Sequence, residues 1–251
     1  MYLKDEKEKF MQYNSSWDLN RASTYIYAKT FTENITASGF FLTFNNVSSV
    51  FLVTNRHVAI NAETFVISLY SSIEEDSLGY IANVSDKVIF HPQDNIDLCL
   101  IKIDNLVLFP NNMTFDSVQI QSIHESMIVS QQDAAQLNYC EDIIMFGAPH
   151  GIYDTKNNLS IAYKGMTATH AGTECFGEPY FMVDLPSWPG SSGSAIYLCN
   201  HETMRNFENT KLLGIFYEAQ YNPHSAPKNK EYIHLGKAIS SYKLLEFKKI
   251  L

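Results

Sequence analysis

Short runs of β-branched and aromatic residues recur along the chain and limit what it can fold into. The first series covers residues 24–32, 39–44, 50–54, 64–69, 87–90 and 98–103, and the second covers 143–146, 159–168, 180–184, 195–198 and 212–217. Turn-forming Asn, Ser, Asp and Gly separate these runs, which is typical of an all-β sandwich or barrel. Helical periodicity is credible only at the two ends. The sequence therefore predicts an all-β protein with short terminal helices.

The length of the chain allows one large domain or two small ones. A chain of 251 residues can bury a sizeable core without disulfides or metals. The segment from about residue 105 to residue 140 is polar and poorly patterned, so it is the natural place for a seam between two β units. No internal repeat or low-complexity linker is evident.

The charge balance and the cysteines narrow the partners and the compartment. Eighteen basic against 27 acidic residues give a net charge of −9, the wrong sign for a surface that neutralises phosphates, so we expect no nucleic-acid partner. No apolar run is long enough for a membrane span, and the N-terminus alternates charge with no apolar stretch behind it. Single cysteines at 99, 140, 175 and 199 predict free thiols and, with no secretory signal, a cytoplasmic protein.

Three stretches place a nucleophilic or titratable side chain beside a β run. In VTNRHVA (residues 53–59) a histidine follows an apolar strand, and in NIDLCLIKI (residues 95–103) Asp97 opens a strand. In PGSSGSAIY (residues 189–197) small residues surround a serine, and a strand follows at once. Each motif alone is weak, because a histidine at a strand end or a Gly-Ser run is usually structural. The three together, in the order His, Asp, Ser, predict a nucleophilic site.

The chemistry requires these residue types together. A serine hydroxyl is a weak nucleophile at its ordinary pKa and needs a base such as a neutral imidazole within hydrogen-bond reach. A carboxylate then fixes the tautomer of that imidazole and stabilises the imidazolium that forms. Gly190 permits a tight turn in which the amides of Gly190 and Ser192 point together at a developing oxyanion. Asp94 is an alternative to Asp97, but only Asp97 directly precedes the strand run.

These motifs resemble those of the trypsin-like, chymotrypsin-fold serine peptidases over residues 22–245, and are most similar to the bacterial branch of HtrA-type proteases and glutamyl endopeptidases. The resemblance implies two six-stranded antiparallel β-barrels, with no cofactor and no metal. It implies a general base at His57, an orienting carboxylate at Asp97, a nucleophile at Ser192 and an oxyanion hole from the amides of Gly190 and Ser192. The implied domains are a helical extension (1–20), a first barrel (21–125), a second barrel (126–238) and a C-terminal helix (239–251). The activity implied is hydrolysis of a protein or peptide through an acyl-enzyme.

The sequence departs from the family pattern at three points. Ser191 stands where the animal digestive enzymes have an aspartate that pairs with a newly cut N-terminus, so activation by that salt bridge is not expected. Phe216-Tyr217-Glu218 stands where glutamyl endopeptidases carry the histidine by which they recognise acidic side chains, so we expect no glutamyl specificity. Few residues follow Ile239, so we expect no peptide-binding PDZ module. The expected substrate pocket, near Pro186 and along Tyr217, Glu218 and Ala219, favours an apolar or small side chain.

Other classes fit the sequence less well. An α/β-hydrolase needs Gly-x-Ser-x-Gly, which the chain lacks. The chain also lacks the His-Glu-x-x-His and Cys-x-x-Cys motifs that would indicate a zinc hydrolase. The serious alternative is a two-barrel protein that retains the three side chains but serves as a binding or scaffold module, because fold does not imply function. The sequence leaves the oligomeric state open.

Overall fold

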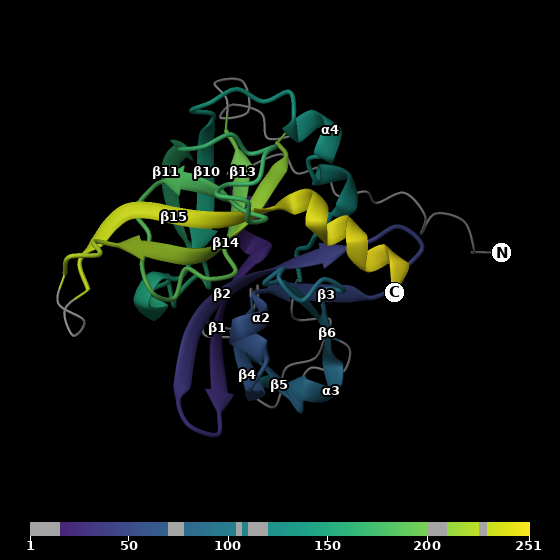
Figure 1. Ribbon diagram of the computed structural model, residues 1–251. Helices are drawn as coiled ribbons and strands as arrows, with labels where there is room; N and C mark the ends of the chain where they lie inside the picture. Colours follow the sequence, from purple (N-terminus) through teal and green to yellow (C-terminus); the bar gives the residue numbers. More distant parts are fainter. Residues whose placement is uncertain (1–15, 70–77, 104–106, 110–119, 200–209, 226–229) are drawn as a thin grey trace.

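The strands of the protein form two separate sheets, one from each half of the chain. The computed structural model describes residues 16–69, 78–103, 107–109, 120–199, 210–225 and 230–251. In Figure 1 the first half lies below and the second half above, with the C-terminal helix running between them.

The first half is a curled nine-stranded sheet in the order β6-β7-β3-β2-β1-β4-β5-β8, with β9 beside β2. Its strands are β1 (Ser23–Thr30), β2 (Asn34–Thr43), β3 (Val50–Thr54), β4 (Ala62–Ser68), β5 (Leu78–Ala82), β6 (Val88–Phe90), β7 (Cys99–Lys102), β8 (Val107–Phe109) and β9 (Ile123–His124). All pairings are antiparallel except that of β9 with β2, which is parallel. Six of these strands, β6 among them, correspond to the six runs of the first series. The other three, β5, β8 and β9, were not predicted: β5 and β8 continue the sheet beyond β4, and β9 pairs with β2.

The second half is a closed antiparallel barrel in the order β10-β11-β12-β15-β14-β13, which confirms six strands here. Its strands are β10 (Asp142–Gly147), β11 (Ile161–Thr167), β12 (Phe181–Asp184), β13 (Ala195–Leu198), β14 (Leu212–Tyr221) and β15 (Tyr232–Ser240). β14 and β15 are the longest pair and extend beyond the barrel (Figure 1). The all-β prediction is thus confirmed, while the exact domain boundaries stay predictions.

The helices are short and lie between or beside the strands. They are α1 (Ser16–Arg21), α2 (Arg56–Ala59), α3 (Val84–Lys87), α4 (Gln131–Ala134) and the 3₁₀ helices η2 (Glu125–Met127), η3 (Pro149–Gly151) and η5 (Ser241–Lys249). A helix was predicted at each end, and η5 fulfils this at the C-terminus. Of the predicted N-terminal extension, residues 1–15 lie outside the described residues and only α1 is seen. Within the described residues, no helix combines the length and the apolar character needed to cross a membrane.

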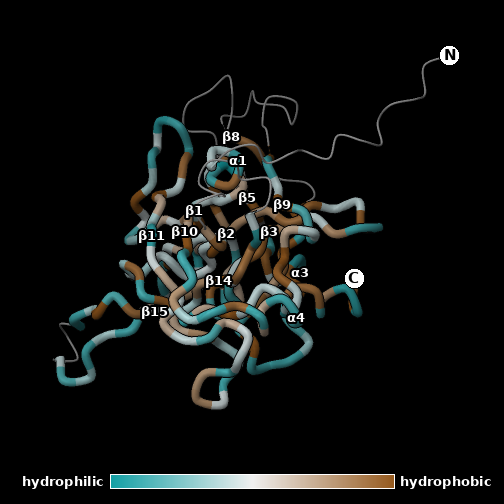
Figure 2. The backbone as a smooth tube through the Cα atoms, turned by 90° about the horizontal axis from the view of Figure 1, so that it is seen from above, coloured by the Kyte–Doolittle hydropathy of each residue, from teal (hydrophilic) through white to brown (hydrophobic). Residues whose placement is uncertain are grey.

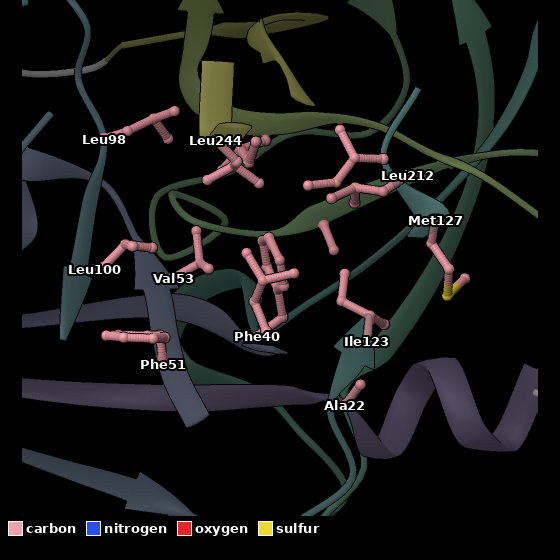
Figure 3. Packing of buried hydrophobic residues seen from close by; sticks show 14 of the residues in the cluster. Ala22, Phe40, Phe51, Val53, Leu98, Leu100, Ile123, Met127, Leu212 and Leu244 are labelled. Carbon is pink, nitrogen blue, oxygen red and sulfur yellow. The ribbon is translucent and has the colours of Figure 1, made fainter. Parts of the chain in front are cut away.

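Each half has a hydrophobic core of its own, and a third cluster joins the two. The joining cluster takes Phe40 and Phe51 from the first sheet, Tyr197 from β13, and Leu244 and Phe247 from η5, all of them at most 3% exposed. Figure 3 shows this cluster at close range, and Figure 2 shows hydrophobic stretches gathered around β2 and β3 with hydrophilic loops outside them. Because this seam is buried and hydrophobic, the halves are packed as one unit and groups placed on either side of it keep a fixed relation.

A buried carboxylate also fastens the two halves to each other. Glu125, in η2 between the two sheets, accepts hydrogen bonds from Asn45 of the first half at 2.6 Å and from Lys248 of η5 at 3.0 Å. Burial by itself raises the pKa of this carboxyl, but the Lys248 ammonium and the Asn45 amide outweigh it and hold the pKa below its usual range. The ionised form of Glu125 is therefore the one that stabilises the fold.

Replacing Lys248 by methionine tests this contact. We expect Lys248→Met to lower the free energy of unfolding at pH 7 by about 1 to 2 kcal/mol, because it removes a charged hydrogen-bond donor from a buried carboxylate. The pKa of Glu125 is lower in the folded protein than the value of about 4.3 expected for the unfolded chain, so its ionised form stabilises the fold above pH 4.3. This stabilisation is lost as the pH falls through the folded-state pKa. Urea unfolding should therefore show a difference between variant and wild type that shrinks at pH 3 to 4. A difference independent of pH would contradict this role of Glu125.

Candidate active site

His57 lies on the single helical turn that follows β3. Val53 and Thr54 are buried in the first sheet, and α2 begins directly after Asn55, so the strand fixes where the histidine starts. The side-chain amide of Asn55 donates to the carbonyl oxygen of Asp97 at 2.9 Å. This bond ties the histidine turn to the loop before β7. The imidazole itself is about half-exposed, with 47% of its side chain accessible.

Asp97 makes hydrogen bonds to His57 through both of its carboxylate oxygens. Oδ2 lies 2.6 Å from Nδ1 of the imidazole, and Oδ1 accepts the backbone N–H of His57 at 2.8 Å. Asp94, the alternative weighed from the sequence, instead pairs with Arg56 at 3.1 Å, and 93% of its side chain is exposed. The geometry therefore favours Asp97 over Asp94 as the partner of the imidazole.

Ser192 lies in a tight turn that only glycine permits at two points. Gly190 and Gly193 have φ values of +95° and +89°, in the region that side chains disfavour. A Cβ added at Gly193 would collide with the carbonyl oxygen of Ser38 in β2. The turn thus packs its backbone directly against the first sheet.

The hydroxyl of Ser192 faces the hollow that His57 also lines. It donates to the carbonyl oxygen of Tyr217 in β14 at 3.2 Å, rather than to the imidazole. The structure therefore joins His57 to Asp97 by hydrogen bonds and brings Ser192 to the same hollow without joining it to His57.

The backbone amides of this turn fall into two groups. Those of Ser191, Gly193 and Ser194 donate to the carbonyl oxygens of Trp188, Phe216 and Ser191. The amides of Gly190 and Ser192, the two predicted from the sequence, donate to none of the described residues. Two unpaired N–H groups on one glycine turn can together bind an oxygen that gains negative charge.

A hollow of about 500 Å³ opens beside these groups, and it contains residues from both halves of the chain. Its lining consists of His57, Asp97, Trp188, Pro189, Ser192, Tyr217, Glu218, Ala219 and Tyr232. Three of the four predicted pocket residues are thus present, whereas Pro186 is not among the described lining residues. Glu218 pairs with Lys237 at 2.7 Å, so its charge is neutralised by the neighbouring strand. Burial, followed by the charge of Glu218 and the nearby Tyr180, raises the pKa of the Tyr217 phenol, so Tyr217 is neutral.

Comparison with solved structures identifies the architecture. No family model matches this sequence, and no curated protein does either. An HtrA-type protease AlgW with a bound tripeptide superimposes with a TM-score of 0.59 at 17% identity, over 92% of this chain and 60% of that one. A thermostable serine protease AL20 from an extremophilic microorganism gives 0.58 at 10% identity, over 93% and 98% of the two chains. Tobacco etch virus protease in complex with product gives 0.55 at 12% identity, over 92% and 79%.

The chain has the chymotrypsin-like fold. This confirms the fold expected from the three motifs. The chain spans only 60% to 63% of the length of the first HtrA-type structures and the Yersinia pestis endoprotease that it matches. At these identities the likeness establishes the fold alone, and the roles of individual residues stay predictions.

Within this chymotrypsin-like fold, the residue before Ser192 is buried and uncharged. Ser191 is 0% exposed, and its hydroxyl has no hydrogen-bond partner among the described residues. A small neutral side chain fills the position without a counterion.

Sequence reasoning missed part of the wall of the hollow. Trp188, which none of the three motifs includes, lines the hollow and packs edge to face on Tyr232 with ring centroids 6.0 Å apart. Tyr232 reaches this place because β15 pairs with β14, where Tyr232 lies opposite Tyr221. No local signal in the sequence marks this, since strand register alone brings the two rings together. Among the described residues, no cluster of His, Cys, Asp and Glu could hold a metal ion.

Proposed function

We propose that the protein is a serine endopeptidase in which Ser192 is the nucleophile, His57 the general base and Asp97 the carboxylate that orients His57. The observation that carries this proposal is the two-point hydrogen bonding of Asp97 to His57 beside a glycine turn with two unpaired amides. Nothing in the packing of a strand end requires these groups together. The serine proteases among the structural neighbours support the same class of reaction.

In the proposed reaction, Ser192 Oγ attacks the carbonyl carbon of a peptide bond while its proton passes to Nε2 of His57. Asp97 holds Nδ1–H and stabilises the imidazolium, and the amides of Gly190 and Ser192 bind the oxyanion. His57 then protonates the leaving amine, and water hydrolyses the acyl-enzyme by the same steps in reverse. The hydroxyl that now donates to Tyr217 would first rotate about its Cα–Cβ bond, and catalytic hydrogen bonds often tighten only when substrate is bound.

The proposed substrate is a protein or peptide, as for the neighbour that was solved with a tripeptide. The substrate side chain next to the scissile bond would enter the hollow between Trp188 and the Tyr217–Ala219 segment. Aromatic rings and Ala219 make most of that wall, which fits an apolar side chain. Asp97 and the net charge of −9 disfavour an acidic one.

A fluorophosphonate probe gives the direct test. We expect the purified protein to be labelled covalently on Ser192, as measured by intact-protein and peptide mass spectrometry, because the probe reacts with a serine that a base has activated. His57→Ala should lower the rate of labelling strongly, and Ser192→Ala should take no label. Labelling that persists in Ser192→Ala, or a wild type that stays unlabelled under all conditions, would reject the assignment.

The alternative is a binding module that keeps the three side chains but cleaves nothing. The hydrogen bond from Ser192 to Tyr217, rather than to His57, is the observation that favours it. The two functions differ in what Ser192→Ala captures from a peptide mixture. An enzyme should hold intact peptides that the wild type cuts, whereas a binding module should hold the same intact peptides in both forms.

A further inference from the structure

The nucleophile turn depends on a residue that the sequence motifs do not include. Ser38 lies in β2 of the first half and is 0% exposed. Its hydroxyl donates to the carbonyl oxygen of Gly190 at 2.8 Å and accepts the backbone N–H of Ala148 at 2.8 Å. Because the hydroxyl oxygen accepts the N–H of Ala148, the hydroxyl proton is donated to the carbonyl oxygen of Gly190.

The backbone of Ser38 strengthens the same contact. Its N–H donates to the carbonyl oxygen of Ser192 at 2.8 Å, and its carbonyl oxygen accepts the hydroxyl of Thr54 at 2.9 Å. Ser38 therefore holds the carbonyl groups of both residues whose amides are predicted to bind the oxyanion. Thr54 closes β3, two residues before Arg56 and three before His57, so one residue links the base strand to the nucleophile turn.

A second anchor acts on the other side of Gly190. The backbone N–H of His150 donates to the carbonyl oxygen of Pro189 at 2.6 Å. The Ala148–Gly151 segment that supplies this donor is itself bonded to the Ser38 hydroxyl through Ala148. The two peptide groups that flank Gly190 are thus held by one connected set of hydrogen bonds, and Ser38 lies at its centre.

Gly190 needs such anchors because it has little conformational preference of its own. Its φ of +95° lies in a region that glycine occupies about as readily as the regions of negative φ. An added Cβ would lie 2.7 Å from the carbonyl oxygen of Ala148, so the packed turn also excludes a side chain that could restrict it. The N–H of Gly190 belongs to the Pro189–Gly190 peptide, so rotation of that peptide would change its direction. Rotation of the Gly190–Ser191 peptide would displace the Ser191–Ser192 peptide that carries the N–H of Ser192.

We propose that Ser38 is a positioning residue for the oxyanion hole, and this rests on the proposed peptidase function. Its hydroxyl fixes the Gly190–Ser191 peptide, which lies between the peptide that carries the N–H of Gly190 and the peptide that carries the N–H of Ser192. Holding this middle peptide keeps the two N–H groups in a fixed relation, so that both can bind one oxyanion. Because Ser38 belongs to the first half and the turn to the second, the hole forms only when the two halves are docked. The first half thereby contributes to oxyanion binding as well as supplying His57 and Asp97.

The test compares Ser38→Ala with Ser241→Ala. Ser241 is also a serine at 0% exposure whose hydroxyl donates to a backbone carbonyl, that of Leu212 in β14 at 2.6 Å, but it is the first residue of η5 and has no bond to the nucleophile turn. We expect Ser38→Ala to lower kcat about 10- to 100-fold with KM within twofold, a part of the 10²–10³ lost with a whole oxyanion donor. Ser241→Ala should keep kcat within twofold at a similar loss of melting temperature.

A peptide aldehyde distinguishes a positioning role from a merely structural one. Ser192 Oγ forms a bond to the aldehyde carbon, the carbonyl π pair becomes an oxyanion, and the hydroxyl proton moves to His57. The inhibition constant of the aldehyde should rise in Ser38→Ala by the same factor by which kcat/KM falls. The matching peptide alcohol forms no oxyanion, so its binding affinity should stay within twofold. If Ser38→Ala fails to fold, Ser38→Cys keeps a weak donor of similar size and should show a smaller loss in the same direction.

The outcomes separate this inference from the proposed function. A wild type that neither cleaves peptides nor binds the aldehyde would reject the peptidase function. An active wild type with an unchanged kcat in Ser38→Ala would reject only the role of Ser38. A crystal structure of Ser38→Ala tests that role without activity: we expect the peptides flanking Gly190 to adopt a second orientation, and an unchanged turn would overturn the inference.

Discussion

Ser192→Ala is expected to lower peptide turnover about 10⁶-fold, as loss of the nucleophile does in serine peptidases that act through a triad. The fold should survive, because the hydroxyl makes a single hydrogen bond, to Tyr217 at 3.2 Å. Of the proposed machinery, substrate binding and the predicted oxyanion hole would remain, and these cannot replace an acyl-enzyme. The measurement is kcat with a fluorogenic peptide or casein substrate, together with circular dichroism and thermal unfolding to verify the fold.

Ser191→Ala is the matched control for this experiment. It removes a hydroxyl from the neighbouring residue of the same turn, one that is buried and has no partner among the described residues. We expect it to keep kcat within a few fold. Equal losses in Ser191→Ala and Ser192→Ala would indicate that the turn collapses in both, and near-normal turnover in Ser192→Ala would move the nucleophile elsewhere.

Asp97→Asn is expected to lower turnover about 10⁴-fold with little change in stability. The asparagine oxygen can still accept the backbone N–H of His57, which Asp97 now accepts at 2.8 Å. Its amide group, however, donates toward Nδ1 where the carboxylate accepts at 2.6 Å. The imidazole then carries its proton on Nε2 and cannot take the proton of Ser192.

Asp94→Asn provides the comparison for Asp97→Asn. Asp94 lies on the same loop, but it is exposed and pairs with Arg56. An exposed ion pair contributes about 0 to 1 kcal/mol, so this variant should keep both turnover and stability. A large loss in Asp94→Asn with near-normal turnover in Asp97→Asn would exchange the roles of the two carboxylates.

The strands could be predicted because their signal is local. Alternating burial along β1 and the first half of β10 follows from residues such as Ile26 and Ile143, which are 0% exposed and lie between less buried neighbours. The number of strands in the first half could not be predicted, because β8 and β9 are only three and two residues long. Segments that short carry no periodicity and are strands only through their partners.

The residues of the candidate site also fall into those that could be predicted from the sequence and those that could not. His57, Asp97 and Ser192 could be located because each stands at the end of an apolar run with a recognisable neighbourhood. Trp188 and Tyr232 could not, since the pairing of β14 with β15 brings Tyr232 to the hollow. The pocket was expected near Pro186, but Trp188 and Pro189 line the hollow on that side instead.

The sequence by itself determined the all-β character, the acidic charge and the order of the three candidate catalytic residues. Those properties depend on residue type and on spacing over a few positions. The tertiary structure decided which aspartate meets His57, which amides stay unpaired and which side chains line the hollow. It also revealed Ser38, whose hydroxyl meets a carbonyl group 152 residues further along the chain. Such contacts form only when the two halves dock through their shared core, because no local pattern encodes the distance between residues on different sheets.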